Sequence, residues 1–314
     1  MPFDLNVKPN VLWTFAGIFC LLIVASLVLM VLRQRNPDKD YTELRQRINS
    51  WWIMVGVFAF AISLSRTVSV AFFGLVSFLA LKEYFSLIPT RRADRRVLFW
   101  AYLAIAFQYF WVSEEWYGMF IIFIPVYAFL FLPMRMVIIG ETHEFLRAAG
   151  TLHWGLMTTV FSISHVAFLL VLPAEGNPRA GGAGLVLFLV VCTQLNDVAQ
   201  YLWGKMLGRH KVIPKVSPNK TWEGLLGGVA TTTLIAIGLS TWLTPLTLVE
   251  AAAAGVLIGL SGFVGDVTIS SLKRDIGVKD SGSLLPGHGG ILDRIDSLTY
   301  TAPLFFHFTY YLHY

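Results

Sequence analysis

The sequence is poor in charged residues and nearly free of cysteine. Asp, Glu, Lys and Arg make up only 14% of its 314 residues, whereas about 25% is usual for a soluble globular protein. Hydrophobic residues make up 56%, and the mean hydropathy is +0.65. A water-soluble core of this size could not bury so much apolar surface, but a bilayer accepts it on every face of a helix. We therefore expect an all-α, polytopic integral membrane protein.

The few cysteines and histidines exclude several kinds of site. The two cysteines, Cys20 and Cys192, lie inside apolar runs and are too few for a disulfide framework. The seven histidines are scattered, and no His-x-x-x-His pair occurs, which argues against a zinc site. The net charge of +5 comes from short basic loops between apolar runs, which is typical of membrane proteins. Nucleic acid is therefore not expected as a partner.

Apolar runs of spanning length recur along the whole chain. A helix needs about 20 apolar residues to cross a bilayer. The first run carries no charge and exceeds the core of a signal peptide, which is about 7–15 residues, so we expect it to be retained as a span. The pattern predicts about ten transmembrane helices, near residues 11–32, 51–65, 67–88, 97–112, 116–133, 153–172, 183–203, 222–243, 250–271 and 297–313.

The distribution of basic residues predicts the orientation. Lys and Arg gather in four places: Arg33, Arg35, Lys39, Arg45 and Arg47; Arg91, Arg92, Arg95 and Arg96; Lys205, Arg209, Lys211, Lys215 and Lys220; and Lys273, Arg274, Lys279 and Arg294. The intervening loops are poor in them. Basic loops face the cytoplasm, so we expect both termini outside, in a bacterial inner membrane or its equivalent.

We expect two regions. Residues 1–150 supply N-terminal transmembrane helices, and residues 151–314 form a C-terminal catalytic region with cytoplasmic loops 204–220 and 272–296. Gly255, Gly259 and Gly262 recur along one side of a span and predict close helix packing. The intramembrane residues Glu83 and His165 are interpreted as structural groups.

Polar and charged residues are concentrated between Gly262 and Asp296. Charge at this density near membrane depth is energetically costly and indicates function. Asp266 ends an apolar helix, and Asp293 and Asp296 share one face of another. Carboxylates from two helices suit Mg²⁺, and glycines around His288 would let the backbone approach a phosphate.

Basic residues in the same stretch could neutralise a polyanion. Metal and basic groups together serve phosphoryl or nucleotidyl transfer. A polar loop whose charges pair among themselves is the alternative, but it does not explain the glycine-rich turn or Asp266 on an apolar helix. The basic residues concerned are Lys273, Arg274, Lys279 and Arg294.

This stretch resembles the signature of phosphatidate cytidylyltransferases (CDP-diacylglycerol synthases). The resemblance rests on Ser270-Ser-Leu-Lys-Arg274, Lys279-Asp-Ser-Gly282 and Leu285-Pro-Gly-His-Gly-Gly-Ile-Leu-Asp-Arg-Ile-Asp296. An upstream patch is also similar: Asp197-Val-Ala-Gln-Tyr201, Gly204, Gly208-Arg-His-Lys211 and Ser217-Pro-Asn-Lys-Thr-Trp-Glu-Gly224. Residues 78–84 are similar to the family's N-terminal half. Gln200 departs from the alanine expected in many members.

The resemblance implies a reaction in which CTP and phosphatidate give CDP-diacylglycerol and pyrophosphate with a divalent metal. It implies Asp266 and Asp293 as ligands of Mg²⁺, with room for a second cation. We predict that the catalytic residues are Lys273, Arg274, Lys279, Asp280, His288, Arg294 and Asp296. We predict that the substrate-binding residues are Asp197, Ser217, Lys220, Thr221 and Glu223.

Two enzyme alternatives and one of another class stay open. The chain could be a CTP-dependent lipid kinase or a cytidylyltransferase for another lipid phosphate. A cation transporter with Asp197 and Asp266 along an ion path is disfavoured, because the sequence shows no internal symmetry. The residues leave a homodimer open.

Overall fold

The computed structural model describes residues 7–91, 94–282, 284 and 289–314. The described residues form helices and no β-strand, apart from an isolated bridge between Lys211 and Thr221. The predicted all-α class is confirmed. The elements are α1 (Pro9–Arg35), α2 (Thr42–Leu64), α3 (Arg66–Leu87), α4 (Arg95–Ser113), α5 (Tyr117–Ile122), η2 (Phe123–Ala128), α6 (Phe129–Ile139), α7 (Phe145–Leu156), η3 (Met157–Phe161), α8 (Ser162–Val171), η4 (Ala174–Gly176), α9 (Gly181–Leu207), α10 (Trp222–Leu243), α11 (Leu248–Asp275), α12 (Leu292–Ile295) and α13 (Leu298–His313).

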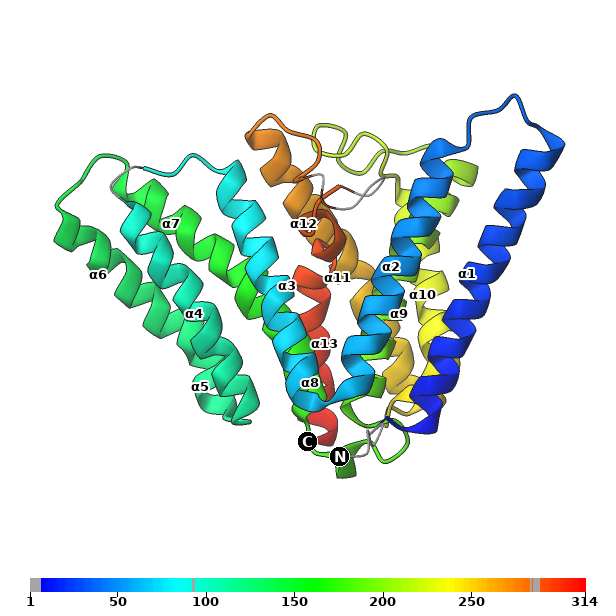
Figure 1. The fold of residues 1–314 in the computed structure, drawn as a ribbon, viewed down its shortest axis with the longest axis horizontal. Coiled ribbons are helices and arrows are strands. Elements are labelled where there is room, and N and C mark those ends of the chain that lie inside the picture. Colours follow the sequence, from blue (N-terminus) through cyan, green and yellow to red (C-terminus); the bar gives the residue numbers. More distant parts are fainter. Residues whose placement is uncertain (1–6, 92–93, 283, 285–288) are drawn as a thin grey trace.

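The helices lie alongside one another and run between two ends of the molecule (Figure 1). In the described part of the chain, eight helical stretches are long and apolar enough to span a membrane, counting α5 to α6 and α7 to α8 as one each. Beside them run α4, which has 19 residues and begins with two arginines, and α13, which has 16 residues. The chain is therefore a multi-pass membrane protein, and the expected layout of about ten helices holds.

Several helices are longer than their apolar runs. Helix α2 begins at Thr42, well before the predicted span, and α11 continues to Asp275. Hydropathy marks only the part of a helix that lies in hydrocarbon, whereas backbone hydrogen bonding continues into the headgroup region. The loops are correspondingly shorter than predicted: 208–221 between α9 and α10, and 276–291 between α11 and α12.

Proline interrupts the stretch from α5 to α6. Pro125 lies in the wide turns of η2, and Pro133 lies inside α6. Proline lacks an N–H and its ring collides with the carbonyl four residues earlier, so a local widening of the helix accommodates it. The span continues to Ile139.

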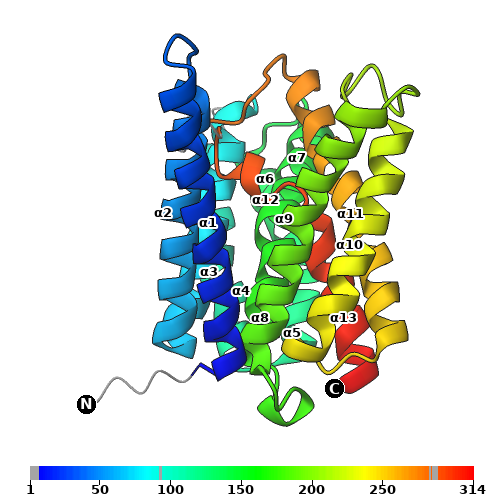
Figure 2. The same cartoon turned by 90° about the vertical axis from the view of Figure 1, so that its right-hand side faces the viewer.

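The two ends of the bundle differ in the charge of the segments that connect the helices. The segments that join α1 to α2, α9 to α10 and α11 to α12 share one end, while α1 begins and α13 finishes at the other (Figures 1 and 2). The predicted alternation of basic and neutral loops therefore matches the path of the chain. Which end faces the cytoplasm stays a prediction.

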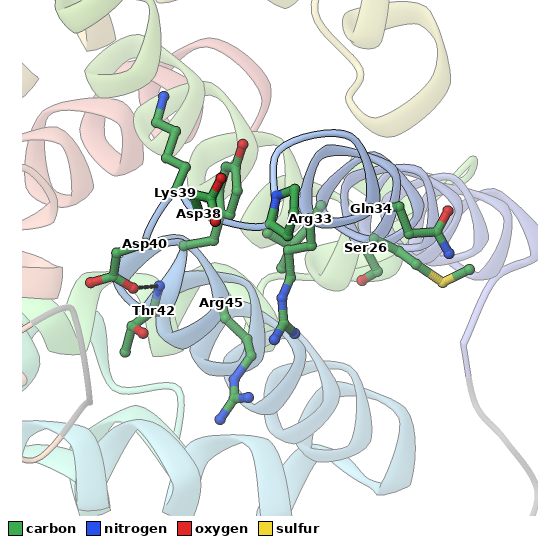
Figure 3. Close-up of a pocket in the computed structure, with 12 residues that line it drawn as sticks. Ser26, Arg33, Gln34, Asp38, Lys39, Asp40, Thr42 and Arg45 are labelled. Atoms are coloured by element: carbon green, nitrogen blue, oxygen red, sulfur yellow. Dashed lines mark hydrogen bonds between the residues drawn. The ribbon is translucent and has the colours of Figure 1, made fainter.

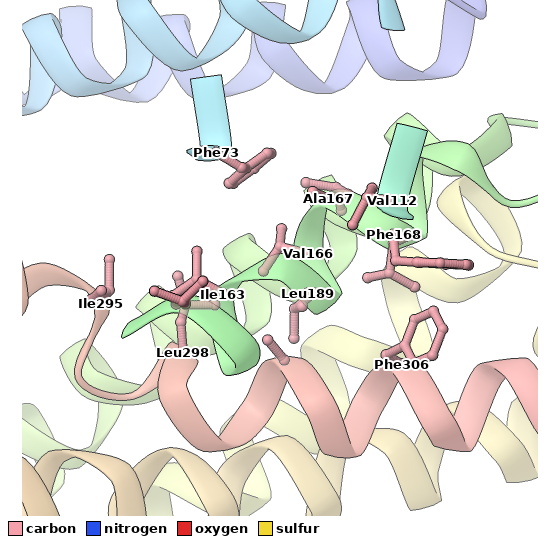
Figure 4. Packing of buried hydrophobic residues seen from close by; sticks show 14 of the residues in the cluster. Phe73, Val112, Ile163, Val166, Ala167, Phe168, Leu189, Ile295, Leu298 and Phe306 are labelled. Carbon is pink, nitrogen blue, oxygen red and sulfur yellow. The ribbon is translucent and has the colours of Figure 1, made fainter. Parts of the chain in front are cut away.

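Helix α8 lies at the centre of the apolar core. Its side chains, among them Ile163 and Val166, are buried against neighbouring helices on several sides (Figure 4). Phe73 of α3 and Phe306 of α13 belong to the same cluster. His165 is also buried here, and its Nδ1 lies 2.8 Å from the Phe161 carbonyl, which agrees with a structural role.

The glycines of α11 bring neighbouring backbones close. A Cβ on Gly255 would lie 2.5 Å from the Thr233 Cα of α10, and one on Gly265 would lie 2.5 Å from the Asp296 carbonyl oxygen. The predicted close packing is confirmed. At Gly265 this packing brings the start of the last span against α11, where the polar residues gather.

Candidate active site

Two helices present polar residues toward one cavity near the loop-bearing end of the bundle. Helix α9 contributes Gln194 and Asp197, which lie three residues apart and hence on one face. Helix α11 contributes Asp266 and Lys273, seven residues apart on its corresponding face. The cavity measures about 280 Å³ and is lined by Gln194, Asp197, Asp266, Lys273, Asp280, Asp293, Arg294 and Asp296.

Asp293 is held by three donors. Its Oδ1 accepts from the Lys273 ammonium at 2.7 Å, and its Oδ2 accepts from the N–H groups of Ser281 at 2.8 Å and Gly290 at 3.0 Å. Burial opposes ionisation of Asp293, but the hydrogen bonds from Lys273 and Gly290 outweigh it and lower its pKa. Asp293 therefore ties the loop 276–291 to α11.

Lys220 reaches the same cavity from the loop between α9 and α10. Its Nζ lies 2.6 Å from Asp266 Oδ2 and donates to Gln200 Oε1 at 3.0 Å. Burial lowers the pKa of Lys220, but the carboxylates of Asp266 and Asp197 outweigh this and raise it. Lys220 is thus a fixed cation beside Asp266.

Asp197 and Asp296 complete the acidic side of the cavity. The Ser297 hydroxyl lies 3.1 and 3.0 Å from the two Asp197 oxygens, and Asp296 Oδ1 accepts from the Ser297 N–H at 2.8 Å. Part of the Asp296 side chain reaches the cavity surface. Even so, burial, followed by repulsion from Asp266 and Asp197, raises its pKa well above the usual value.

Glu83 of α3 connects the N-terminal helices to this site. Its Oε2 accepts from the Leu292 N–H at 2.7 Å. A Cβ on Gly282 or Gly290 would collide with the Glu83 carboxylate, so these glycines leave the space that it occupies. Glu83 makes structural contacts, as interpreted from the sequence: it accepts a hydrogen bond from the first residue of α12 and packs against glycines of the preceding loop.

Other predicted residues lie around the cavity without lining it. Thr221 caps α10 by accepting from the Gly224 N–H, and Glu223 accepts from the Arg209 N–H at 3.0 Å. Arg274 donates to the Val216 carbonyl at 3.3 Å, which joins α11 to the loop 208–221.

Two further predicted residues, Ser217 and Lys279, also lie apart from the described cavity. The Ser217 carbonyl accepts from the Lys220 N–H at 3.2 Å, and the Lys279 side chain is exposed. His288 falls outside the described residues.

The donor set suits a hard cation, although the described residues contain no ready-made group of three metal-ligating side chains. Two of the aspartates, Asp266 and Asp293, are paired with lysines. Repulsion from Asp266 and Asp197 contributes to the raised pKa of Asp296, and a cation bound among these oxygens would offset that repulsion. The predicted metal role of Asp266 and Asp293 is compatible with this arrangement and stays a prediction.

A larger cavity lies elsewhere, where α1 and α2 separate toward the segment that joins them. It measures about 840 Å³ and is lined by residues such as Arg33, Asp40 and Arg45 (Figure 3). Asp40 accepts from the Thr42 N–H at 2.8 Å. None of the predicted site residues lines this cavity, so the smaller acidic cavity is the candidate active site.

Comparison with known proteins places these residues in a family. The sequence profile described as the cytidylyltransferase family matches residues 45–312. The chain belongs to the cytidylyltransferase family. The match runs from α2 to α13, so it includes both helices that line the acidic cavity and the N-terminal helices that support it.

Individual proteins are also similar to this chain in sequence. The chain is 48% identical over 298 residues to the uncharacterised protein YnbB of Escherichia coli (strain K12), which covers 95% of this chain and 98% of the relative. It is 44% identical over 136 residues to a phosphatidate cytidylyltransferase of Synechocystis sp., covering 42% of this chain and 46% of that protein. A phosphatidate cytidylyltransferase of Staphylococcus haemolyticus is 40% identical over 134 residues, covering 40% of this chain and 49% of that protein.

Family membership makes this membrane protein a nucleotidyltransferase that uses CTP. No role in the site was predicted for Gln194 or Gln200, and Glu83 was predicted to be structural but without its contact to the site. Gln194 and Gln200 could have been found from their spacing, because each lies three residues from Asp197 on the same helix face. Glu83 offered no such signal, since it reaches the site from a helix distant in sequence.

Proposed function

We propose that this cytidylyltransferase transfers CMP from CTP to phosphatidate, giving CDP-diacylglycerol and pyrophosphate. The observation that carries the proposal is the acidic cavity of a membrane protein of this family. Lys273 and Asp293 form an ion pair on its wall, and Lys220 forms an ion pair with Asp266, which also lines it. The names of the Synechocystis and Staphylococcus relatives support phosphatidate as the acceptor. The site is proposed to face the cytoplasm, where CTP is present.

The reaction needs no nucleophile from the protein. An oxygen of the lipid phosphate attacks the α-phosphorus of CTP, a new P–O bond forms, and the bond from that phosphorus to the bridging oxygen of the β-phosphate breaks. Pyrophosphate leaves with the electron pair of that bond. The protein contributes positioning and charge stabilisation, which dominate catalysis of such transfers.

The basic residues provide the charge. Arg294 lines the cavity, and its Nε is buried without a hydrogen-bond partner among the described residues. An arginine fork binds phosphate oxygens through parallel hydrogen bonds. Lys220 and Lys273 are proposed to hold the triphosphate from two sides, and each forms an ion pair with an aspartate. Asp266 and Asp293 are proposed to hold Mg²⁺, which would neutralise phosphate charge and orient the nucleophile.

The position of the transferred phosphorus tests this function. Purified protein is supplied with phosphatidate in detergent micelles and CTP labelled at the α- or the γ-phosphorus. We expect the α-label to enter the lipid and the γ-label to leave as pyrophosphate. Entry of the γ-label into the lipid would identify a CTP-dependent lipid kinase and contradict the proposal. Replacing phosphatidate by another lipid phosphate tests the acceptor, and a faster reaction with it would reassign the substrate.

A further inference from the structure

An apolar groove lies between α4 and the stretch from α5 to α6. It has a volume of about 380 Å³, and its walls are aromatic and aliphatic side chains such as Trp100, Leu103, Phe107, Phe123 and Tyr127. It shares no lining residue with the acidic cavity. These helices occupy the left side of the view in Figure 1, apart from α11 and α12. The groove is therefore separate from the candidate active site.

The groove runs along the helix axes and opens toward lipid. Its α4 wall extends from Trp100 to Phe107, and the facing wall runs in the opposite chain direction from Met119 to Leu132. Phe107 is 46% exposed and Tyr127 is 50% exposed. In a bilayer, an apolar channel in this direction lies parallel to the acyl chains.

An arginine stands at one end of the groove. Arg135 follows Leu132 by one turn of α6, and its guanidinium carbon lies 5.7 Å from the centre of the Trp100 ring. Its Nε is buried and has no hydrogen-bond partner in the part of the chain that the structure describes. No carboxylate of the described residues forms an ion pair with it. Arg135 lies four residues, or about 6 Å along the axis, before Ile139, where both α6 and the candidate span end, so we infer that it lies near the headgroup region.

An unpaired guanidinium on a membrane helix is costly unless it meets an anion. Its cation–π contact with Trp100 compensates only part of the lost hydration. Arg95 and Arg96 begin α4 at the same end of the bundle and add positive charge. An apolar channel with a cation at its headgroup end fits an anionic amphiphile.

We propose that the groove and Arg135 form a binding site for an anionic glycerophospholipid that is not the reacting lipid. One acyl chain lies along the wall from Trp100 to Phe107, and the phosphate accepts hydrogen bonds from Arg135. The site lies away from the acidic cavity, so the lipid stabilises the packing of α4 against α6 rather than taking part in the transfer.

Native mass spectrometry of the delipidated full chain tests this site. The probes are phosphatidylglycerol and phosphatidylcholine with identical acyl chains, added to the protein in a non-ionic detergent. We expect Arg135→Gln to weaken phosphatidylglycerol binding about tenfold or more, because a charged hydrogen-bond donor is lost. Phosphatidylcholine binding should change less. Arg147→Gln is the matched control, because Arg147 is an exposed arginine near the same end and pairs with Glu144.

Two further variants separate charge from shape. Arg135→Lys keeps the charge and should keep the preference for phosphatidylglycerol. This variant tests the role of the charge even if Arg135→Gln does not fold. Leu103→Trp fills the groove and should weaken binding of both lipids. Equal phosphatidylglycerol binding by wild type and Arg135→Gln, or an equal loss in Arg147→Gln, would overturn the proposal. Unchanged lipid binding by Leu103→Trp would also overturn it. Dissociation of a dimer by this substitution would do the same, because the groove would then hold a second copy of the chain.

Discussion

At the residue scale, each of two aspartates is joined to a lysine that comes from another segment. Asp293 binds Lys273 and two backbone N–H groups, and Asp266 binds Lys220. Such pairs hold the carboxylates in place before substrate arrives. A bound nucleotide and its cation would redistribute these contacts, with the lysines turning to phosphate and the carboxylates to the metal.

Asp293→Asn should abolish turnover while the protein stays folded and inserted. The amide cannot serve as a carboxylate ligand, and it leaves the Lys273 charge uncompensated. We expect the rate at saturating CTP to fall by orders of magnitude. Asp275→Asn is the control, because Asp275 is exposed and outside the cavity. If Asp293→Asn kept more than about a tenth of the wild-type rate at saturating Mg²⁺, the proposed metal role would be wrong.

Lys220→Ala and Lys273→Ala should separate nucleotide binding from lipid binding. If both lysines contact CTP phosphates, either substitution should lower kcat/KM for CTP about five- to hundredfold. The apparent KM for phosphatidate should move little. Lys215→Ala, an exposed lysine of the same loop as Lys220, should behave as wild type. Steady-state kinetics at varied CTP and fixed lipid decides, and an unchanged kcat/KM in both variants would remove these lysines from the site.

At the element scale, α3 supports the loop between α11 and α12 through Glu83. The carboxylate accepts from the Leu292 N–H and fills the space that the missing side chain of Gly290 leaves. This contact explains how N-terminal helices without catalytic aspartates contribute to the site. It also explains why Gly290 is required at its position.

A double-mutant cycle tests this support. Glu83→Ala should lower kcat about tenfold, because the Leu292 N–H loses its acceptor and the turn loosens. It should also speed hydrogen exchange in residues 289–296. Gly290→Ala should be comparably harmful because its Cβ meets Glu83, and the double variant should be no worse than Glu83→Ala alone. Fully additive losses would show that the two positions act independently. Lys82→Ala, exposed on the adjacent position, is the control.

Local sequence patterns and motifs predicted the elements and all of the residues that line the acidic cavity except Gln194. Apolar runs located the spans, and the spacing of Asp293 and Asp296 placed both on the cavity. The predicted ends of α2 and α11 were wrong where polar residues extend these helices. The hydropathy of a segment indicates whether it can lie in the hydrocarbon of a bilayer, not whether it forms a helix. The contact of Glu83 could not be predicted, because it depends on the packing of α3 against a loop more than half the chain away.

At the scale of the whole molecule, the two ends of the bundle differ in charge. The loop 208–221, the last turn of α11 and α12 carry the basic residues Lys220, Lys273 and Arg294, and the short η4 segment lies toward the opposite end (Figure 1). By the positive-inside rule, we propose that the loop-bearing end faces the cytoplasm.

Cysteine accessibility tests this orientation. In a Cys20→Ser background, a cysteine at the exposed position Asn219 should resist an impermeant thiol reagent in intact cells and react after permeabilisation. A cysteine at Glu175, exposed on η4, should react in intact cells. The opposite labelling pattern would invert the topology and place the acidic cavity away from cytosolic CTP.

The central claim is that CMP passes intact from CTP to the lipid phosphate. The most direct measurement is phosphorus NMR of the reaction of the purified protein with CTP, Mg²⁺ and phosphatidate. The account predicts that a phosphoanhydride linkage (P–O–P) appears in the lipid and that an equal amount of free pyrophosphate forms. Asp293→Asn should give neither product. Formation of CDP with a lipid pyrophosphate, or CTP consumption that does not require the lipid, would contradict the account.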